Sequence, residues 1–207
     1  MVDNKWIGRW IRRALGIGLL LAVMPGVPAA APSLAPDEGA RLQRGEIVFR
    51  GEVPPRDGRQ IGTGGTALVL IRAPAEEVWQ ILTDFEGYGG LFPRVRKSAV
   101  VEQRANRTLV QFDLRVGPFS FRFFVNNFAR RREHLLWWRL DRQRENDLFQ
   151  DTWGYWKLDP VRGGVLVTYA MGSVTHLPAF LTRGAERDGV IQTARALKAR
   201  AEETAGI

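Results

Sequence analysis

The sequence predicts an α+β domain in which a curved antiparallel sheet of seven strands wraps around a long C-terminal helix. Three observations predict this fold. An apolar helical face lies within residues 76–85, six strand-like segments follow between residues 95 and 176, and a second helical pattern closes the chain. A sheet with one apolar face must bury that face against another layer, and the terminal helix supplies this layer.

The first strand and helix lie in residues 66–85. The run TALVLIRAP has the composition of a strand and ends at Pro74, which suits the first turn of a helix. Two glutamates follow, where acidic side chains stabilise a helix N-terminus. Val78, Leu82 and Phe85 then recur at i, i+4 and i+7, and this spacing predicts an amphipathic helix.

The helix ends at a glycine-rich corner, because it cannot continue through Gly87, Gly89, Gly90 and Pro93. Asp84 stands immediately before this corner. We interpret Asp84 as the cap of a short second helix, with a catalytic carboxylate as the alternative.

Six candidate strands follow the corner, separated by turn signals that are rich in glycine, proline and polar residues. Their predicted bounds are 95–103, 107–117, 119–131, 133–142, 149–159 and 164–176. Two of them alternate between apolar and polar residues, as expected for strands that bury one face of a sheet. The apolar positions of these two strands are Val110, Phe112, Leu114 and Val116, then Phe119, Phe121, Phe123 and Val125.

The last helix is predicted at residues 178–204. Val190, Ala194, Leu197 and Ala201 recur there at spacings of four, three and four, which places them on one face. This face is the one that we expect the sheet to grip.

Residues 1–29 have the three-part layout of a secretory signal peptide, with a basic start, an apolar run and small residues at the end. Cleavage after Ala29 or Ala31 satisfies the small-residue rule. We therefore expect a periplasmic or secreted protein, and an uncleaved membrane anchor is the alternative. The Arg12-Arg13 pair leaves Sec and twin-arginine export both open. Residues 30–63 are predicted to be a tether, with a short strand at 46–53 whose place at the sheet edge stays open.

The 207-residue chain contains no cysteine, which excludes disulfides, zinc–thiolate sites, iron–sulfur clusters and thiol nucleophiles. His134 and His176 form no spaced motif with carboxylates, so we interpret them as structural or surface residues and predict no metal and no other cofactor. Asp147 and Asp151 flank a strand start; we interpret them as solvated loop carboxylates, with an acid/base pair as the alternative.

The net charge of the chain is +8, of which the first 29 residues carry +3, so cleavage leaves about +5. In an exported protein such a charge favours anionic lipid headgroups over nucleic acid as a partner. Arg130, Arg131 and Arg132 form a basic turn. The default interpretation of this turn is a solvated basic face, and transient docking on an anionic membrane surface is the sharper alternative.

Two stretches carry a resemblance to a known family. APAEEVWQILTDFEGYGGLFPRV and, further on, GYWKLDPVRGGVLVTY resemble the START-like helix-grip (SRPBCC) superfamily, in particular its bacterial polyketide cyclase/dehydrase and coenzyme Q-binding branch. The resemblance covers about residues 64–205 and implies that residues 64–207 form a START-like ligand-binding domain. It also implies a deep apolar cavity between the sheet and the terminal helix, bordered by the two short helices.

On this resemblance Gly87, Gly89 and Gly90 form a mobile lid, and a tight helix–helix corner is the alternative. Aromatic residues on candidate inward faces are expected to line the cavity, unless the sheet packs tightly on the helix and forms a solid core. The expected lining residues are Phe121, Phe123, Trp138, Trp156, Tyr169 and Phe180.

These observations predict an exported protein that holds or carries a hydrophobic small molecule, such as a lipid or an isoprenoid quinone. Apolar burial would do the work, so no catalytic residue is assigned. A cyclase or dehydratase that acts on a polyketide-like substrate in the same cavity is the alternative, with Asp84, Tyr169 and His176 as its weak candidates. A third interpretation, a ribosome- or partner-binding module, requires a cytosolic chain.

Overall fold

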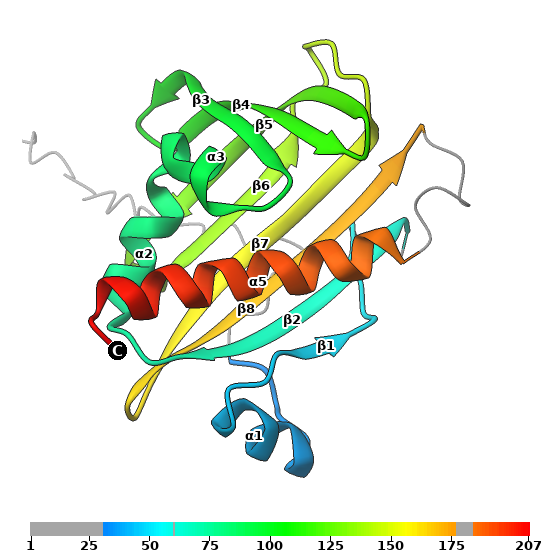
Figure 1. The fold of residues 1–207 in the computed structure, drawn as a ribbon. Coiled ribbons are helices and arrows are strands. Elements are labelled where there is room, and N and C mark those ends of the chain that lie inside the picture. Colours follow the sequence, from blue (N-terminus) through cyan, green and yellow to red (C-terminus); the bar gives the residue numbers. More distant parts are fainter. Residues whose placement is uncertain (1–30, 60, 177–183) are drawn as a thin grey trace, which may run out of the picture.

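A computed structural model of the chain describes residues 31–59, 61–176 and 184–207. Its main feature is an eight-stranded antiparallel sheet in the order β1-β2-β8-β7-β6-β5-β4-β3 (Figure 1). The strands are β1 (Val48–Arg50), β2 (Thr63–Ile71), β3 (Val95–Arg104), β4 (Arg107–Val116), β5 (Phe119–Arg130), β6 (Leu135–Leu140), β7 (Phe149–Val161) and β8 (Gly164–Thr175).

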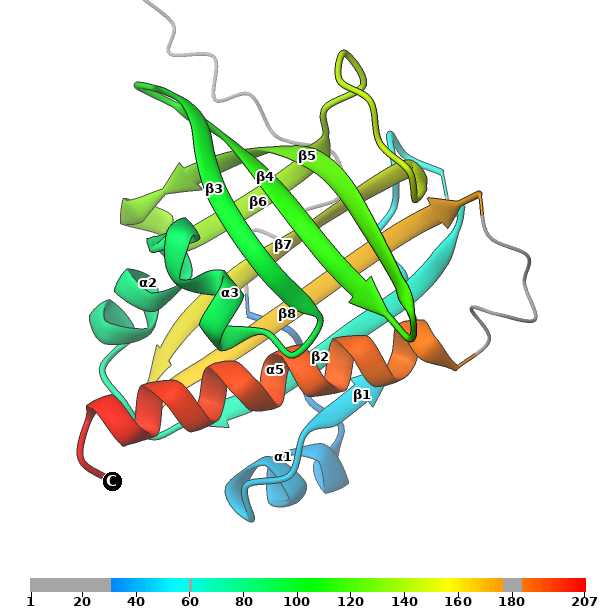
Figure 2. The same ribbon diagram turned by 45° about the horizontal axis from the view of Figure 1, so that its top comes forward.

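The sheet curves around the long C-terminal helix α5 (Ala185–Thr204), which crosses its concave face (Figure 2). Val190, Ala194, Leu197 and Ala201 of this helix are completely buried in the main core. The predicted spacing of the terminal helix and the predicted α+β class, with an antiparallel sheet around that helix, are therefore confirmed.

A polar network holds the C-terminal half of α5 on the sheet. The Lys198 ammonium donates to the carbonyl oxygen of Leu70 at 2.8 Å and pairs with Glu202, which also accepts the Arg72 N–H at 2.9 Å. Burial alone would raise the pKa of Glu202, but its bonds to Lys198 and Arg72 lower the pKa below its ordinary value. The network fixes this end of the helix.

Two short helices and a helical turn follow β2 and close one end of the sheet (Figure 1). They are α2 (Ala75–Thr83), η1 (Phe85–Gly87) and α3 (Tyr88–Leu91). The Asp84 carboxylate accepts a hydrogen bond from the Gly87 N–H at 3.2 Å, which confirms its predicted capping role. The Tyr88 hydroxyl donates to the carbonyl oxygen of Leu82 at 2.6 Å and so ties α3 back to α2.

The sheet has eight strands where seven were predicted, because β1 pairs antiparallel with β2 at the edge. In addition, the predicted tether contains a helix, α1 (Pro36–Gln43). Both additions cover the outer face of β2. Leu68 and Leu70 of that face are buried together with Leu42 of α1, Val48 of β1 and Leu166 of β8.

Some predictions fall on residues that the structure does not describe. The predicted signal peptide, residues 1–29, and residues 178–183 of the predicted terminal helix lie outside the described residues. Within the described ranges, no helix is both long enough and apolar enough to cross a membrane.

Candidate functional site

A cavity of about 240 Å³ lies between the concave face of the sheet and the N-terminal half of α5. Its walls come from α3, from strands β3 to β8, and from residues 185–193 of α5. This volume falls just below the roughly 300–1,000 Å³ that is usual for small-molecule pockets, so the cavity suits a compact ligand or one apolar segment of a larger one.

One wall is a stack of aromatic rings from neighbouring strands. The rings of Trp156 and Tyr169 lie 4.0 Å apart, centre to centre, at an interplanar angle of 16°, and Trp138 stacks on the same tyrosine at 5.9 Å. Phe92, which follows α3, also stacks on Trp156 at 6.1 Å. Because each ring is held by the next, the wall presents a preformed apolar surface.

A second aromatic group lines the opposite part of the sheet. Phe112 of β4 and Phe123 of β5 are directly paired across the strands, and their rings stack at 5.5 Å. Phe149, at the start of β7, meets the ring of Phe123 edge-on at 4.9 Å. All three residues line the cavity and are buried.

Gly154 of β7 makes room for the first wall. It pairs with Trp138 on one neighbouring strand and with Met171 on the other. A methyl group at this position would overlap both the Trp138 indole and the carbonyl oxygen of Ala170. The glycine therefore lets the Trp138 ring lie flat across the sheet.

Two buried phenols, those of Tyr88 and Tyr169, line the cavity. The Tyr88 hydroxyl is committed to Leu82, and the Tyr169 hydroxyl is hydrogen-bonded to Thr193 of α5. Burial raises the pKa of both phenols well above the ordinary value. Both are therefore neutral at physiological pH and do not act as bases.

Two further polar side chains of the cavity, those of Asn127 and Thr152, are also hydrogen-bonded. The Asn127 amide donates to the carbonyl oxygens of Val125 and Thr108, both at 3.4 Å, and the Thr152 hydroxyl donates to Gly172 at 3.2 Å. These groups serve the strands that carry them, so the interior offers apolar contact before it offers hydrogen bonds.

The partly exposed lining residues gather where the start of β3 faces the N-terminal half of α5, and this is the open side of the cavity. Arg94 and Glu186 are the charged residues there. The Arg94 guanidinium lies against Gly189, since a methyl group on this glycine would come within 3.2 Å of its Nη1 atom. Glu186 accepts a hydrogen bond from the Thr63 hydroxyl at 3.0 Å.

Four of the six predicted lining residues, Phe123, Trp138, Trp156 and Tyr169, line the cavity. Phe121 does not line the cavity. It lies on β5 two residues before Phe123, toward the start of the strand, and packs against the core from there. Phe180 lies outside the described residues. Contact of these residues with a ligand stays a prediction.

The three corner glycines differ from one another. A methyl group on Gly87 would overlap the Asp84 carboxylate, and one on Gly89 would come within 3.1 Å of the carbonyl oxygen of Arg96, whereas Gly90 has nothing within 4 Å. The first two glycines thus allow a close packing of the corner, as the alternative interpretation expected. Motion of the corner as a lid stays a prediction.

The basic turn lies away from the open side of the cavity. Arg130 pairs with Glu133, and Arg131 pairs with Glu76 at the start of α2, so acidic residues offset part of the charge. Arg132 is exposed and has no ion pair within the part of the chain that the structure describes. Membrane docking through this turn stays a prediction.

The weak acid/base candidates do not converge in the cavity. Asp84 caps η1, His176 is exposed, and neither lines the cavity, so only Tyr169 of the three does.

Asp151 was interpreted as solvated, but it is buried and accepts hydrogen bonds from Arg56 at 2.9 Å and from Arg142 at 2.8 Å. The carboxylate is buried because two guanidinium groups compensate for its lost hydration.

Sequence reasoning missed several lining residues. Phe112 and Thr193 had an available signal, because the first shares the predicted apolar face of its strand and the second precedes the buried Ala194. Arg94 had none, since it lies between Pro93 and the first residue of β3 and takes part in no periodic pattern.

The chain was compared with protein families, with curated proteins and with solved structures. Residues 71–198 match the family described as polyketide cyclase / dehydrase and lipid transport. No curated protein matches the chain in sequence.

Several solved structures are similar in fold. An aromatase/cyclase, Zhui from Streptomyces sp. R1128, is 16% identical, covering 66% of this chain and 92% of its own, with a TM-score of 0.60. A START superfamily protein from Mycobacterium smegmatis is 17% identical over 67% and 97%, with a TM-score of 0.58. A STAR-related lipid transfer protein from Xanthomonas axonopodis is 18% identical over 67% and 85%, with a TM-score of 0.55. At these identities the likeness shows the fold alone.

Proposed function

Since this chain belongs to the polyketide cyclase / dehydrase and lipid transport family, we propose that it holds or carries a hydrophobic small molecule, a lipid or an isoprenoid quinone-like compound, in its cavity. The observation that carries the proposal is the stacked aromatic wall around a preformed cavity of about 240 Å³. Each 100 Å² of apolar ligand surface buried there contributes roughly 2.5 kcal/mol.

The state of the polar groups supports binding over chemistry. An enzyme of the acid/base type needs a pair of groups that converge on the substrate. Here the phenols of Tyr88 and Tyr169 are neutral and hydrogen-bonded, and Asn127 and Thr152 are bonded to backbone carbonyl oxygens. A carrier requires no more than this.

A cyclase or dehydratase acting on a polyketide-like substrate is the second candidate, and one observation favours it. Tyr169 lies in the cavity wall with its hydroxyl bonded to Thr193, and a neutral phenol is able to donate a proton to a substrate. Loss of a detected turnover in Tyr169→Phe, with ligand binding unchanged, would favour this candidate over the carrier.

The proposal includes export, which is supported by the layout of residues 1–29. The N-terminal sequence of the protein recovered from the cell envelope tests it. A chain that begins at residue 30 or 32 supports export, whereas an intact N-terminus on a cytosolic protein contradicts it and favours a partner-binding module.

Binding itself is tested by calorimetric titration of the protein with a neutral probe that has an apolar chain, 1-decanol. Val116 lines the cavity at the end of β4, and Val116→Phe should reduce the affinity at least about tenfold by obstructing the cavity. Val101→Phe is the matched control, because Val101 is exposed on β3 and does not line the cavity. Equal affinities of the two variants would contradict the proposal.

A further inference from the structure

Arg94 differs from the other partly buried cationic side chains that the structure describes. Nearly all described arginines and lysines that are partly buried have an acidic or backbone partner, as Arg50 has in Glu38 and Lys157 in Asp159. Within the described ranges, Arg94 is the one partly buried cation whose side chain makes no hydrogen bond and no ion pair.

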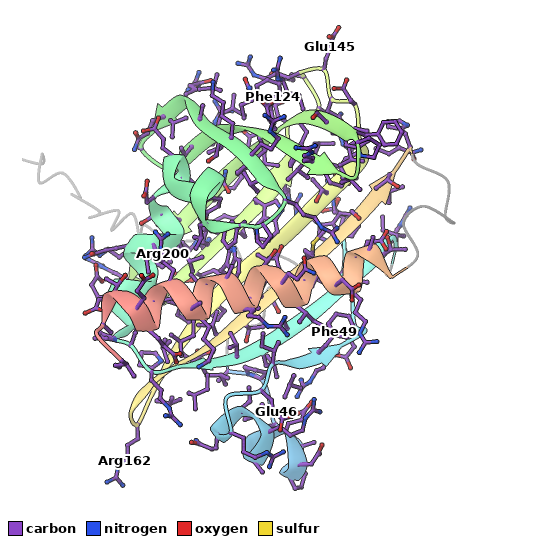
Figure 3. All side chains as sticks on the ribbon, viewed as in Figure 1. Glu46, Phe49, Phe124, Glu145, Arg162 and Arg200 are labelled. Carbon is purple, nitrogen blue, oxygen red and sulfur yellow. The ribbon has the colours of Figure 1, made fainter. Side chains whose placement is uncertain are left out.

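The other unpaired arginines of the described residues are exposed, where water solvates them. Arg162, which projects from the turn between β7 and β8, is an example (Figure 3). Removing a cation from part of its hydration without a partner is costly. An unpaired guanidinium at the edge of an apolar cavity therefore indicates a partner that the described part of the chain does not supply.

The surroundings hold Arg94 in place at the open side. Its carbonyl oxygen accepts the N–H of Arg115 on β4 at 2.8 Å, which joins this residue to the sheet just before β3 begins. Its guanidinium lies over Gly189 of α5, where the absence of a side chain leaves room for it. The Arg94 side chain thus reaches from the edge of the sheet to α5, and the residue lines the cavity between them.

From this geometry we infer that Arg94 binds an anionic head group of an amphiphilic ligand, a carboxylate or a phosphate, while the apolar body of the ligand occupies the cavity. The inference depends on the proposed binding function and specifies its ligand class. A guanidinium suits both head groups, because its parallel N–H donors match two oxygens of either anion.

Glu186 is the other charge at the open side, and it opposes an anion. Its carboxylate is held by Thr63 on β2 and forms no ion pair with Arg94. The Glu186 carboxylate therefore leaves the positive charge of Arg94 unneutralised, but it repels an anion bound to Arg94. Glu186→Gln should strengthen binding of an anionic ligand and leave a neutral one unaffected.

The test uses three probes with one apolar chain, namely decanoate, decyl phosphate and 1-decanol, titrated calorimetrically into the full-length mature protein at pH 7.5. We expect at least one anionic probe to bind roughly tenfold or more tightly than the alcohol, because charge-assisted hydrogen bonds exceed neutral ones by this margin. The stronger of the two anions identifies the head group as carboxylate or phosphate.

Arg94→Gln should abolish the advantage of the anion and leave binding of 1-decanol unchanged, and Arg94→Lys should keep part of it. Arg96→Gln is the matched control, since Arg96 is exposed and does not line the cavity. Unchanged binding of the alcohol also shows that the variant is folded.

Two results overturn the inference in different ways. If all three probes bind equally, or if the anion keeps its advantage in Arg94→Gln, the carrier function stands and the role of Arg94 is refuted. If no probe binds to the wild-type protein, the proposed function fails and the inference fails with it.

Discussion

Gly154→Ala tests whether the aromatic wall depends on a missing side chain. The new methyl group would overlap the indole of Trp138 and the carbonyl oxygen of Ala170, and it would stand between β6 and β8. The indole is able to rotate away, but the carbonyl belongs to the β7–β8 ladder, so the backbone itself must shift. Overpacking of a core usually costs about 1–3 kcal/mol, and a backbone obstacle places this variant near the upper end.

The assay is equilibrium unfolding in urea. With a slope of about 2 kcal/mol per M, a loss of about 3 kcal/mol lowers the midpoint by roughly 1.5 M. Gly90→Ala is the control, because nothing lies within 4 Å of its methyl position in α3. Alanine exceeds glycine in helix propensity by roughly 1 kcal/mol, so this midpoint should stay constant or rise. A Gly154→Ala midpoint equal to that of the wild type, at the same slope, would refute the reasoning.

Three further predictions concern the corner, the buried phenol and the N-terminal segment. Gly89→Ala should lower the thermal midpoint where Gly90→Ala does not, because the carbonyl oxygen of Arg96 lies 3.1 Å from the new methyl group; equal midpoints would favour a loose lid over a packed corner. Tyr169→Phe should cost about 1 kcal/mol in urea unfolding through the lost bond to Thr193, and no loss would show that the bond contributes nothing. Arg50 lowers the pKa of Glu38 from 4.5 to about 2, so this pair stabilises the fold above pH 4.5 and loses its effect as the pH falls toward 2. Glu38→Gln should therefore melt below the wild type at pH 7 and converge with it near pH 2, and a gap that persists at pH 2 would contradict the assignment.

The sheet and the terminal helix were predictable because their signals are local and periodic. Alternation placed Phe112 and Phe123 on one face, and the structure pairs them directly across β4 and β5. The buried positions of α5 are those of its apolar repeat, from Val190 to Ala201. Asp84 was predictable as a cap because a short polar residue stood between a helix and a glycine-rich turn.

The outer layer was harder to predict, since the tether composition of residues 30–44 gives no strong helical pattern. A signal was nevertheless present in β2. Ala67 to Ile71 are apolar without alternation, and a strand of this kind is buried on both faces. The run therefore indicates a cover on the outer side, which α1 and β1 supply.

The cavity was predictable in its aromatic residues and unpredictable at its open side. The alternation of apolar and polar residues places both Phe121 and Phe123 on the inward face of β5, but only Phe123 lines the cavity. Periodicity predicts the face on which a residue lies, and it does not predict where along the strand the cavity ends. The position of Arg94 depends on a close approach between the start of β3 and Gly189 of α5, far apart in sequence. No local pattern encodes such a contact.

The central claim is that the cavity carries a hydrophobic cargo. The most direct measurement is native mass spectrometry of the protein, purified gently from its natural source, followed by organic extraction of whatever is bound. The account predicts one molecule of a hydrophobic compound per chain, a lipid or a quinone-like compound. An anionic lipid would also support the role of Arg94, whereas a neutral quinone-like compound would support the carrier function alone. A ligand-free mass, with no uptake from a lipid extract of the same cells, would contradict it.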